Sequence, residues 1–464
     1  MSRRFASLLV GISLCACASG AAGQRMTVAN HVVQGDRAAS SEWLHGSAMH
    51  TRLVVGDDGE TYIGLWIDTP RGAAVTRAPL DVALLIDTSG SMSGDKITHA
   101  RLAAASFIDG LSDGDIVSVF AFSDGVRALA APTVVDANSR ARLLQQVNGI
   151  YAAGGTNLYG GLTAAQDALA AAPSTHPVRR VVLISDGRAN IGPSSAGELS
   201  DLAARVTENG SQVSAIGVGL DYDEGTLGAI AARTAGRLHL EQPQQMAVIL
   251  HDELSLLGQT VATNAVLEFS PEDGVVLEPV GVAHARRQGS RYEVPLGSLY
   301  GAQHREVLFR VRAPLGAGGS HTLGSARLRY EDPSRRGAPR SSNGLAIRVE
   351  TAARGATPVV NERVAAMVTR WDVAQSQLRA AQLMNEGEVA RADAALAHAQ
   401  EQLQRAQASV RDESALRALR SQSAAVSRNR SSAQRVLRSP SAAPAARRGA
   451  ALEMNAAGMH DMGY

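Results

Sequence analysis

The stretch from Asp81 to Met92 constrains the fold more than any other part of the sequence. It reads Asp-Val-Ala-Leu-Leu-Ile-Asp-Thr-Ser-Gly-Ser-Met, an apolar run that stops at an acid followed by hydroxyl side chains. A short run of branched aliphatic residues is typical of a strand that is covered on both faces in a parallel sheet. In open α/β sheets, ligands bind at the carboxyl ends of the strands. Asp87, Ser89 and Ser91 are therefore expected to form part of a site at such an edge.

Two later segments are expected to complete this site. Residues 154–158 read Gly-Gly-Thr-Asn-Leu, a glycine-rich turn that presents Thr156 just before a helical stretch. Residues 181–187 read Val-Val-Leu-Ile-Ser-Asp-Gly, a second buried strand that stops at an acid, Asp186. Two carboxylates and three hydroxyls are hard oxygen donors, which suit a small dication such as Mg²⁺ with its about six oxygen ligands.

These three pieces, in this order, resemble the metal-ion-dependent adhesion site of von Willebrand factor type A domains, and the resemblance covers roughly residues 80–260. It implies a doubly wound, Rossmann-like α/β fold, which the predicted alternation of strands and helices also favours. It further implies a divalent cation, Mg²⁺ or else Mn²⁺ or Ca²⁺, to which a partner protein supplies an Asp or Glu. The alternative is a domain that keeps the fold without binding metal, as happens in this family where site residues are replaced. All five implied ligands are present: Asp87, Ser89, Ser91, Thr156 and Asp186.

Residues 1–23 have the features of a secretory signal peptide. Arginines at positions 3 and 4 precede an apolar stretch and then small residues. No other run approaches the ~18 apolar residues of a membrane-spanning helix. Residues 14–17 read Leu-Cys-Ala-Cys and resemble a bacterial lipoprotein box with Cys17 as the lipidated residue, and ordinary cleavage near residues 22–23 is the alternative. We expect an exported lipoprotein of the outer membrane or facing the periplasm, held at the membrane only by its lipid, or otherwise a periplasmic or secreted protein.

The segments on either side of the α/β domain are expected to form one β-structure. Residues 24–47 are largely polar, as in a linker, and residues 48–79 hold two strand-like pieces about a Gly-Asp-Asp-Gly turn, which predicts a β-hairpin. Residues 261–352 hold short strand-like pieces between turn signals, which predicts a β-sandwich. A lone hairpin is not stable, so we expect it to join the sandwich and make the type A domain an insertion. Several exported bacterial type A proteins look similar in this respect.

The C-terminal part is expected to be helical and then disordered. Residues 358–410 predict a helical hairpin, because an apolar residue recurs every seven positions at Val389, Leu396, Leu403 and Val410. Residues 411–464 predict a disordered basic tail, with nine arginines against two acids between residues 411 and 448. The alternative is an arm that binds an anionic envelope polymer or lipid. Nucleic acid is not expected, because no aromatic residue lies between residues 411 and 448 and the net charge of the chain is only +1.

Enzymatic motifs are present only in the wrong context. Residues 93–96 match the Ser-x-x-Lys of penicillin-interacting enzymes, but Lys96 is the only lysine and no Lys-Thr-Gly element exists. We expect Lys96 only to begin the helix behind the metal loop. Residues 110–114 match Gly-x-Ser-x-Gly but follow a predicted helix rather than a strand. We therefore expect no enzyme but a metal-dependent module that binds a protein. The alternatives are a structural envelope assembly protein and, more remotely, a metal-dependent hydrolase, for which no general base is identifiable.

Overall fold

The computed structural model describes residues 43–54, 59–70, 77–186, 188–208, 210–219, 222–241, 243–281, 285–314, 318–353, 356–438 and 444–462. The expected signal peptide, Cys17 and the linker up to residue 42 lie outside these ranges. The predicted linker ends too late, because strand β1 already begins at Leu44. Across the described ranges, no helix is long and apolar enough to cross a membrane.

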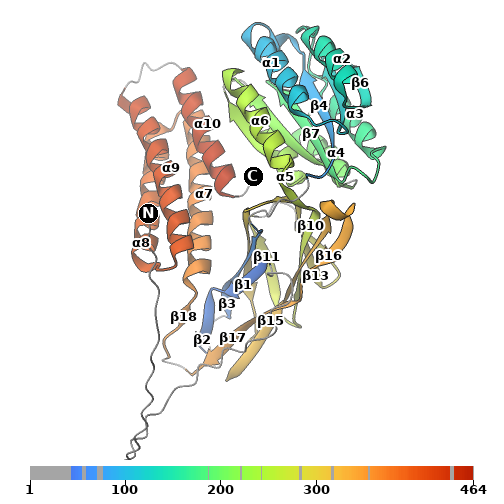
Figure 1. Cartoon of the computed structure of the whole chain (residues 1–464). Helices are drawn as coiled ribbons and strands as arrows, with labels where there is room; N and C mark the ends of the chain where they lie inside the picture. The colour runs from blue at the N-terminus through green and yellow to red at the C-terminus, as the bar shows by residue number, and fades with distance from the viewer. Residues whose placement is uncertain are drawn as a thin grey trace, which may run out of the picture. The chain divides into compact units, whose positions relative to one another are not determined.

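A six-stranded sheet forms the α/β domain, in the order β6-β5-β4-β7-β8-β9 (Figure 1). Strand β4 lies at its centre between β5 and β7, and all of its residues are buried, as the apolar run predicts. Five strands are parallel and the edge strand β6 is antiparallel. The bounds are β4 (Leu80–Asp87), β5 (Ile116–Phe122), β6 (Val126–Val134), β7 (Val178–Ser185), β8 (Gln212–Val218) and β9 (Leu238–Glu241).

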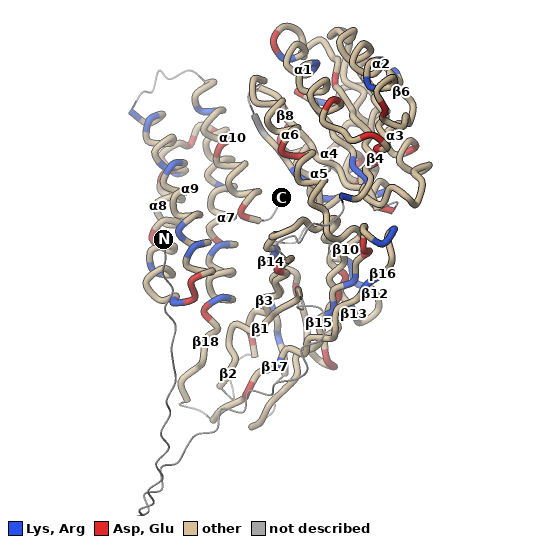
Figure 2. The backbone as a smooth tube through the Cα atoms, in the orientation of Figure 1, with Lys and Arg blue, Asp and Glu red and all other residues tan. Residues whose placement is uncertain are grey.

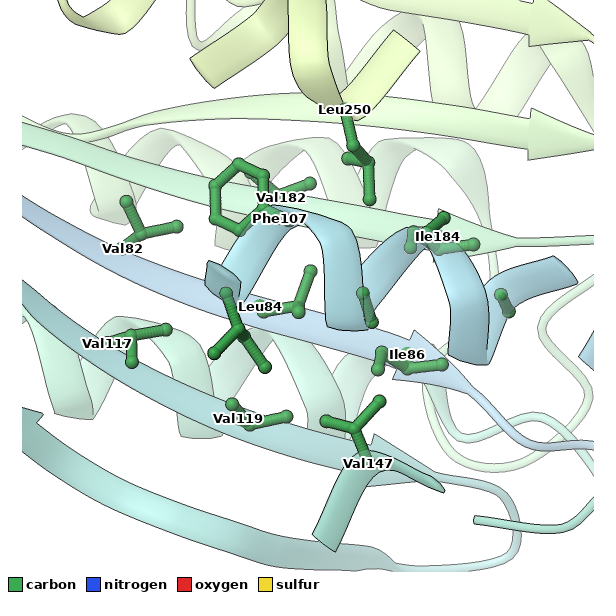
Figure 3. Close-up of a cluster of buried hydrophobic side chains, with 14 of the residues drawn as sticks. Val82, Leu84, Ile86, Phe107, Val117, Val119, Val147, Val182, Ile184 and Leu250 are labelled. Atoms are coloured by element: carbon green, nitrogen blue, oxygen red, sulfur yellow. The ribbon is translucent and has the colours of Figure 1, made fainter. Parts of the chain in front are cut away.

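Helices cover both faces of this sheet, because the side chains of β4 alternate between two apolar cores. Val82, Leu84 and Ile86 pack on one face against Phe107 of α1 and Leu250 of α6 (Figure 3). That face carries α1 (Asp95–Gly110), α2 (Ala137–Asn148) and α6 (Met246–Leu257). The other face carries α3 (Leu158–Ala170), α4 (Ala196–Glu208) and α5 (Glu224–Arg233).

Two further sheets enclose a second apolar core, where Phe269 and Phe309 lie 5.7 Å apart between ring centroids. The first sheet has the order β1-β3-β14-β11, and β3 pairs with β14 over its whole length. Its strands are β1 (Leu44–Ala48), β3 (Glu60–Asp68), β11 (Val276–Val280) and β14 (His304–Arg312). The second has the order β12-β13-β10-β15-β17-β2-β18, with β16 paired to β15. Its strands are β2 (His50–Val54), β10 (Thr260–Pro271), β12 (Arg286–Gln288), β13 (Arg291–Tyr300), β15 (Gly319–Asp332), β16 (Ala338–Ser341), β17 (Leu345–Ala352) and β18 (Val359–Val360).

The predicted hairpin of residues 48–79 is wrong. Strands β2 and β3 belong to different sheets: β3 lies between β1 and β14, whereas β2 pairs with β17 and β18. The physical reason is burial, since Leu53 of β2 and Ile63 of β3 enter the same core from opposite sheets. The strands before the α/β domain therefore pair with strands after it, although not as a hairpin.

The predicted disordered tail of residues 411–464 is also wrong. This segment forms two helices, α9 (Glu413–Arg438) and α10 (Pro444–Asp461), which follow α7 (Glu362–Glu386) and α8 (Val389–Ser409). Helices α9 and α10 pack with α7 and α8 around a shared core, so the predicted hairpin is only half of a larger helical assembly. Leu419, Val426 and Ala433 repeat every seven residues on the buried side of α9. Polar partners fill the remaining positions, as in the bond of 2.9 Å that Asn429 donates to Gln377.

A buried charged cluster joins the α/β domain to the sandwich. Arg180 of β7 and Glu253 of α6 are both fully buried, and Arg180 Nε lies 3.7 Å from Glu253 Oε1. Arg180 also donates a hydrogen bond to the hydroxyl of Tyr300, at the end of β13. Burial by itself raises the pKa of Glu253, but the nearby ring of His239, 3.6 Å away, and the charges of Arg180 and Arg237 outweigh it and lower this pKa to about 2.

Candidate metal site in the α/β domain

Asp87 is the last residue of the central strand β4 and is fully buried. Its Oδ1 accepts a hydrogen bond of 2.8 Å from the backbone N–H of Ser89, and its Oδ2 accepts one of 2.6 Å from the hydroxyl of Ser185. Burial raises the pKa of Asp87 from 3.8 to about 6, although these hydrogen bonds act in the opposite direction. The fold therefore holds a carboxylate where its ionised form is costly unless a cation lies nearby.

Ser89 and Ser91 connect this carboxylate to the neighbouring strand. Ser91 lies in a short 3-10 turn, Gly90–Met92, which Ser89 directly precedes, and the two hydroxyl oxygens are 3.0 Å apart. Ser91 donates a hydrogen bond of 2.8 Å to Oδ1 of Asp186, which directly follows β7. A continuous set of oxygen atoms therefore runs along the carboxyl ends of β4 and β7.

Lys96 brings a positive charge into the site. It lies in the first turn of α1, and its ammonium group forms an ion pair with Oδ2 of Asp186. The side chain of Asp186 is fully buried, and that of Lys96 is 21% exposed. The expectation that Lys96 merely begins the helix missed this contact. The site thus holds two carboxylates and one ammonium.

The loop that carries Thr156 is fixed to the same edge by its backbone. Gly90 donates to the carbonyl of Gly154 over 2.9 Å, and the backbone N–H of Thr156 donates to Oδ1 of Asn190 over 2.8 Å. Gly154 has φ of +82°, and a Cβ there would lie 2.6 Å from Oδ2 of Asp124. Only glycine therefore suits this close turn.

The structure thus brings Asp87, Ser89, Ser91, Thr156 and Asp186 to one edge of the sheet. Sequence reasoning missed the residues that support them, above all Ser185, Asn190 and Lys96. Ser185 ends β7 beside the end of β4 and could have been found, because a hydroxyl at the end of one parallel strand can reach an acid at the end of its neighbour, here Asp87. Asn190 and Lys96 have no local signal for their contacts.

The donor set fits a hard dication and not a softer metal. No group of three or more His, Cys, Asp or Glu side chains that could hold a metal occurs among the described residues. The five oxygen-bearing side chains offer two carboxylates and three hydroxyls, which suit an ion that keeps several of its waters, as Mg²⁺ does. Such an ion would meet the Lys96 ammonium next to Asp186.

Comparison with known proteins identifies this domain. Residues 81–253 match the family model of the von Willebrand factor type A domain. The chain contains a von Willebrand factor type A domain. Its doubly wound sheet is the fold that the sequence resemblance implies, and the predicted fold class is confirmed. The site lies within the matched residues.

The similarity to solved structures covers more of the chain than this domain. A von Willebrand factor type A protein from Catenulispora acidiphila superposes with a TM-score of 0.68 at 21% identity, covering 82% of this chain and 89% of that one. The ArnB paralog VWA2 from Sulfolobus acidocaldarius gives a TM-score of 0.57 at 16% identity, covering 81% and 92%. At these identities the similarity concerns the fold.

The curated relatives match only part of this chain, and the match covers only part of their own length. An uncharacterised protein of Synechocystis is 27% identical over 269 residues, which are 56% of this chain and 63% of that protein. The human inter-alpha-trypsin inhibitor heavy chain H4 is 25% identical over 229 residues, 47% of this chain and 24% of that protein. The chain therefore spans less than two thirds of the length of these relatives.

Proposed function

We propose that this chain is an exported cell-envelope protein whose type A domain binds a protein partner through a divalent cation, with Mg²⁺ as the first candidate. Asp87, Ser89, Ser91, Thr156 and Asp186 would hold the cation. The observation that carries the proposal is the connected set of oxygen atoms from buried Asp87 through the two serines to Asp186. The proposal includes no catalytic activity, and export rests on the leader sequence and the lipobox at Cys17.

The charges of the site favour an acidic partner group. Asp87 and Asp186 carry two negative charges and Lys96 one positive charge, so the ionised site has a formal charge of −1. A bound dication changes this to +1, and one Asp or Glu of the partner brings it to zero. The cation would supply an electrophilic centre with a free coordination position for that carboxylate. A neutral side chain would leave the charge unbalanced in a largely buried site.

The rim of the site offers a contact for such a partner. Tyr151 belongs to the same loop as Thr156, and its side chain is 68% exposed. The loop is fixed two residues later, where Ala153 donates to the carbonyl of Thr88 over 2.8 Å. Exposed tyrosine on a fixed loop is a common centre of binding energy in protein interfaces.

Calorimetry on the full chain tests the metal site. We expect saturable heats when Mg²⁺ is titrated into wild type, none with Asp87→Ala, and an affinity about tenfold weaker with Thr156→Ala, as loss of one polar ligand implies. Asp113→Ala is the matched control, because this aspartate is 75% exposed and its ion pair is with Arg140. Equal heats in wild type and Asp87→Ala would refute the metal site.

Partner capture separates the proposal from its alternative. Wild type, crosslinked in envelope fractions, should capture its partner with Mg²⁺ and lose it in chelator, and Asp87→Ala should fail in both. If the domain is a structural assembly contact, the complexes will survive chelation and the variant will retain them.

A further inference from the structure

Helix α9 carries a row of arginines on its solvent face. Over the 26 residues of this helix, the exposed arginines are Arg417, Arg420, Arg428, Arg435 and Arg438. At about 100° per residue their spacing confines them to an arc of about 80°, and at about 1.5 Å per residue the row is about 32 Å long. We call these five residues the arginine ridge. Figure 2 shows basic positions recurring along α9.

Packing fixes the direction of the ridge. Leu419, Val426 and Ala433 occupy the opposite side of α9 and are buried in the helical core. Between Arg417 and Arg435, the other exposed positions hold only serine or alanine, as at Ser427 and Ser431. Short neighbours leave the guanidinium groups accessible along the whole row.

The charge of the ridge is almost uncompensated. Its one ion pair among the described residues joins Arg417 to Glu413 at 3.8 Å, and both side chains are mostly exposed, so the pair contributes little. Glu413 is also the only acid of α9. By contrast Arg430, beside the ridge, is paired with Asp393 at 3.0 Å. Four like charges thus remain on one helix face, at a cost in mutual repulsion that an anionic partner would remove.

Acidic residues border the ridge on both sides. On one side Asp393 of α8 accepts hydrogen bonds from Arg430 and Gln434 of α9. On the other, Glu453 of α10 accepts one from Ser432. The basic surface is therefore one helix wide. A planar anionic membrane would meet these acids as well as the arginines, whereas a thin polymer could follow the ridge between them.

We propose that the arginine ridge binds a linear acidic polysaccharide that carries carboxylate, sulfate or phosphate groups. Guanidinium groups bind such anions through paired hydrogen bonds. Helix α9 has no aromatic side chain on which nucleobases could stack. Its only large exposed apolar residue is Leu437, which gives little surface for insertion into lipid. This inference does not depend on the metal site.

The test uses immobilised heparin and polygalacturonate as probes for the full chain. We expect Arg420, Arg428 and Arg435 changed together to Gln to weaken binding at least about tenfold at low salt, because each cation on a polyanion adds a factor of several. Arg127, Arg142 and Arg348, changed together to Gln, form the control with the same loss of charge. They are exposed arginines outside α9, and binding should change less than about twofold, as for charges away from the contact.

Three outcomes would overturn the inference. Equal loss in both triple variants would mean that net charge alone drives binding. Failure of wild type to bind either polymer at low salt would exclude an acidic polysaccharide as the ligand of the ridge. Tighter binding to vesicles of phosphatidylglycerol and phosphatidylcholine than to the polymers, lost in the ridge variant, would assign the ridge to a lipid surface. Circular dichroism of both variants should match that of wild type.

Discussion

Replacing Asp87 by Asn should stabilise the metal-free protein while it removes metal binding. The carboxylate of Asp87 is fully buried, and its pKa lies at about 6 instead of 3.8. Asn keeps an oxygen that can accept the hydrogen bond from the backbone of Ser89 and carries no charge. A gain of stability together with a loss of metal binding is what is expected of a binding-site residue that is kept for function at a cost in stability.

The magnitude follows from the pKa shift. A difference of about two units, at about 1.4 kcal/mol per unit, makes the ionised Asp87 cost about 3 kcal/mol of the free energy of unfolding above pH 6. Because the pKa of this acid is higher in the folded state than in the unfolded state, its ionisation lowers the free energy of unfolding. Below pH 3.8 the group is protonated in both states and costs nothing, and between pH 3.8 and 6 the cost grows as the unfolded chain loses its proton. Asp87→Asn should therefore exceed wild type in stability by about 3 kcal/mol at pH 7, with the difference shrinking as the pH falls.

Hydrogen exchange of peptides from β4 and β7, measured in chelator, is the suitable assay. Tryptophan fluorescence would not report on the type A domain, because the three tryptophans are Trp43, Trp66 and Trp371. Added Mg²⁺ should increase protection in wild type and leave Asp87→Asn unchanged. Asp113→Asn, in an exposed loop of the same domain, serves as the control. Reduced protection in Asp87→Asn without metal would show that the buried carboxylate stabilises the fold, and the reasoning would fail.

Two further predictions concern charged groups. Lys96→Met removes the ammonium that pairs with Asp186, so Mg²⁺ should bind about tenfold tighter by calorimetry, as for a loss of about 1.4 kcal/mol of repulsion; weaker binding would mean that Lys96 supports the site. Glu253→Gln should lower the free energy of unfolding by about 3 kcal/mol at pH 7, because it leaves the buried charge of Arg180 unpaired. The pKa of Glu253 is lowered to about 2 from 4.5, so this difference should persist above pH 4.5 and disappear as the pH falls towards 2. Urea unfolding followed by circular dichroism checks it, with exposed Glu208→Gln as control; a constant difference across this range would contradict it.

The candidate site was largely predictable, because its main signals are local. Asp87 and Asp186 directly follow strongly apolar strands, and parallel strands bring their carboxyl ends together. The contact between Lys96 and Asp186 was not predictable, since it joins residues 90 positions apart through the packing of α1. Nothing in the neighbourhood of Asn190 indicates that it holds Thr156.

The two wrong predictions outside the site, the disordered tail and the β-hairpin, both arose where the sequence pattern is weak. The core positions of α9 include Gln422 and Asn429, so the charge of the segment outweighed its seven-residue repeat and indicated disorder. For β2 and β3, the turn between the strands indicated a hairpin, but the burial of Leu53 and Ile63 in one core decides the pairing. Local turn signals do not specify which sheet a strand joins.

The pairing of β3 with β14 affects the order in which the chain can fold during synthesis. Asp68 and His304 are opposite one another in this ladder yet are separated by 236 residues. At translation rates of roughly 5 to 20 residues per second, one edge of β3 stays unpaired for about 12 to 47 s until β14 has been synthesised. The whole type A domain emerges from the ribosome in that interval and can fold first, so the nascent chain carries a finished domain beside an open strand edge that must be kept from pairing with other chains.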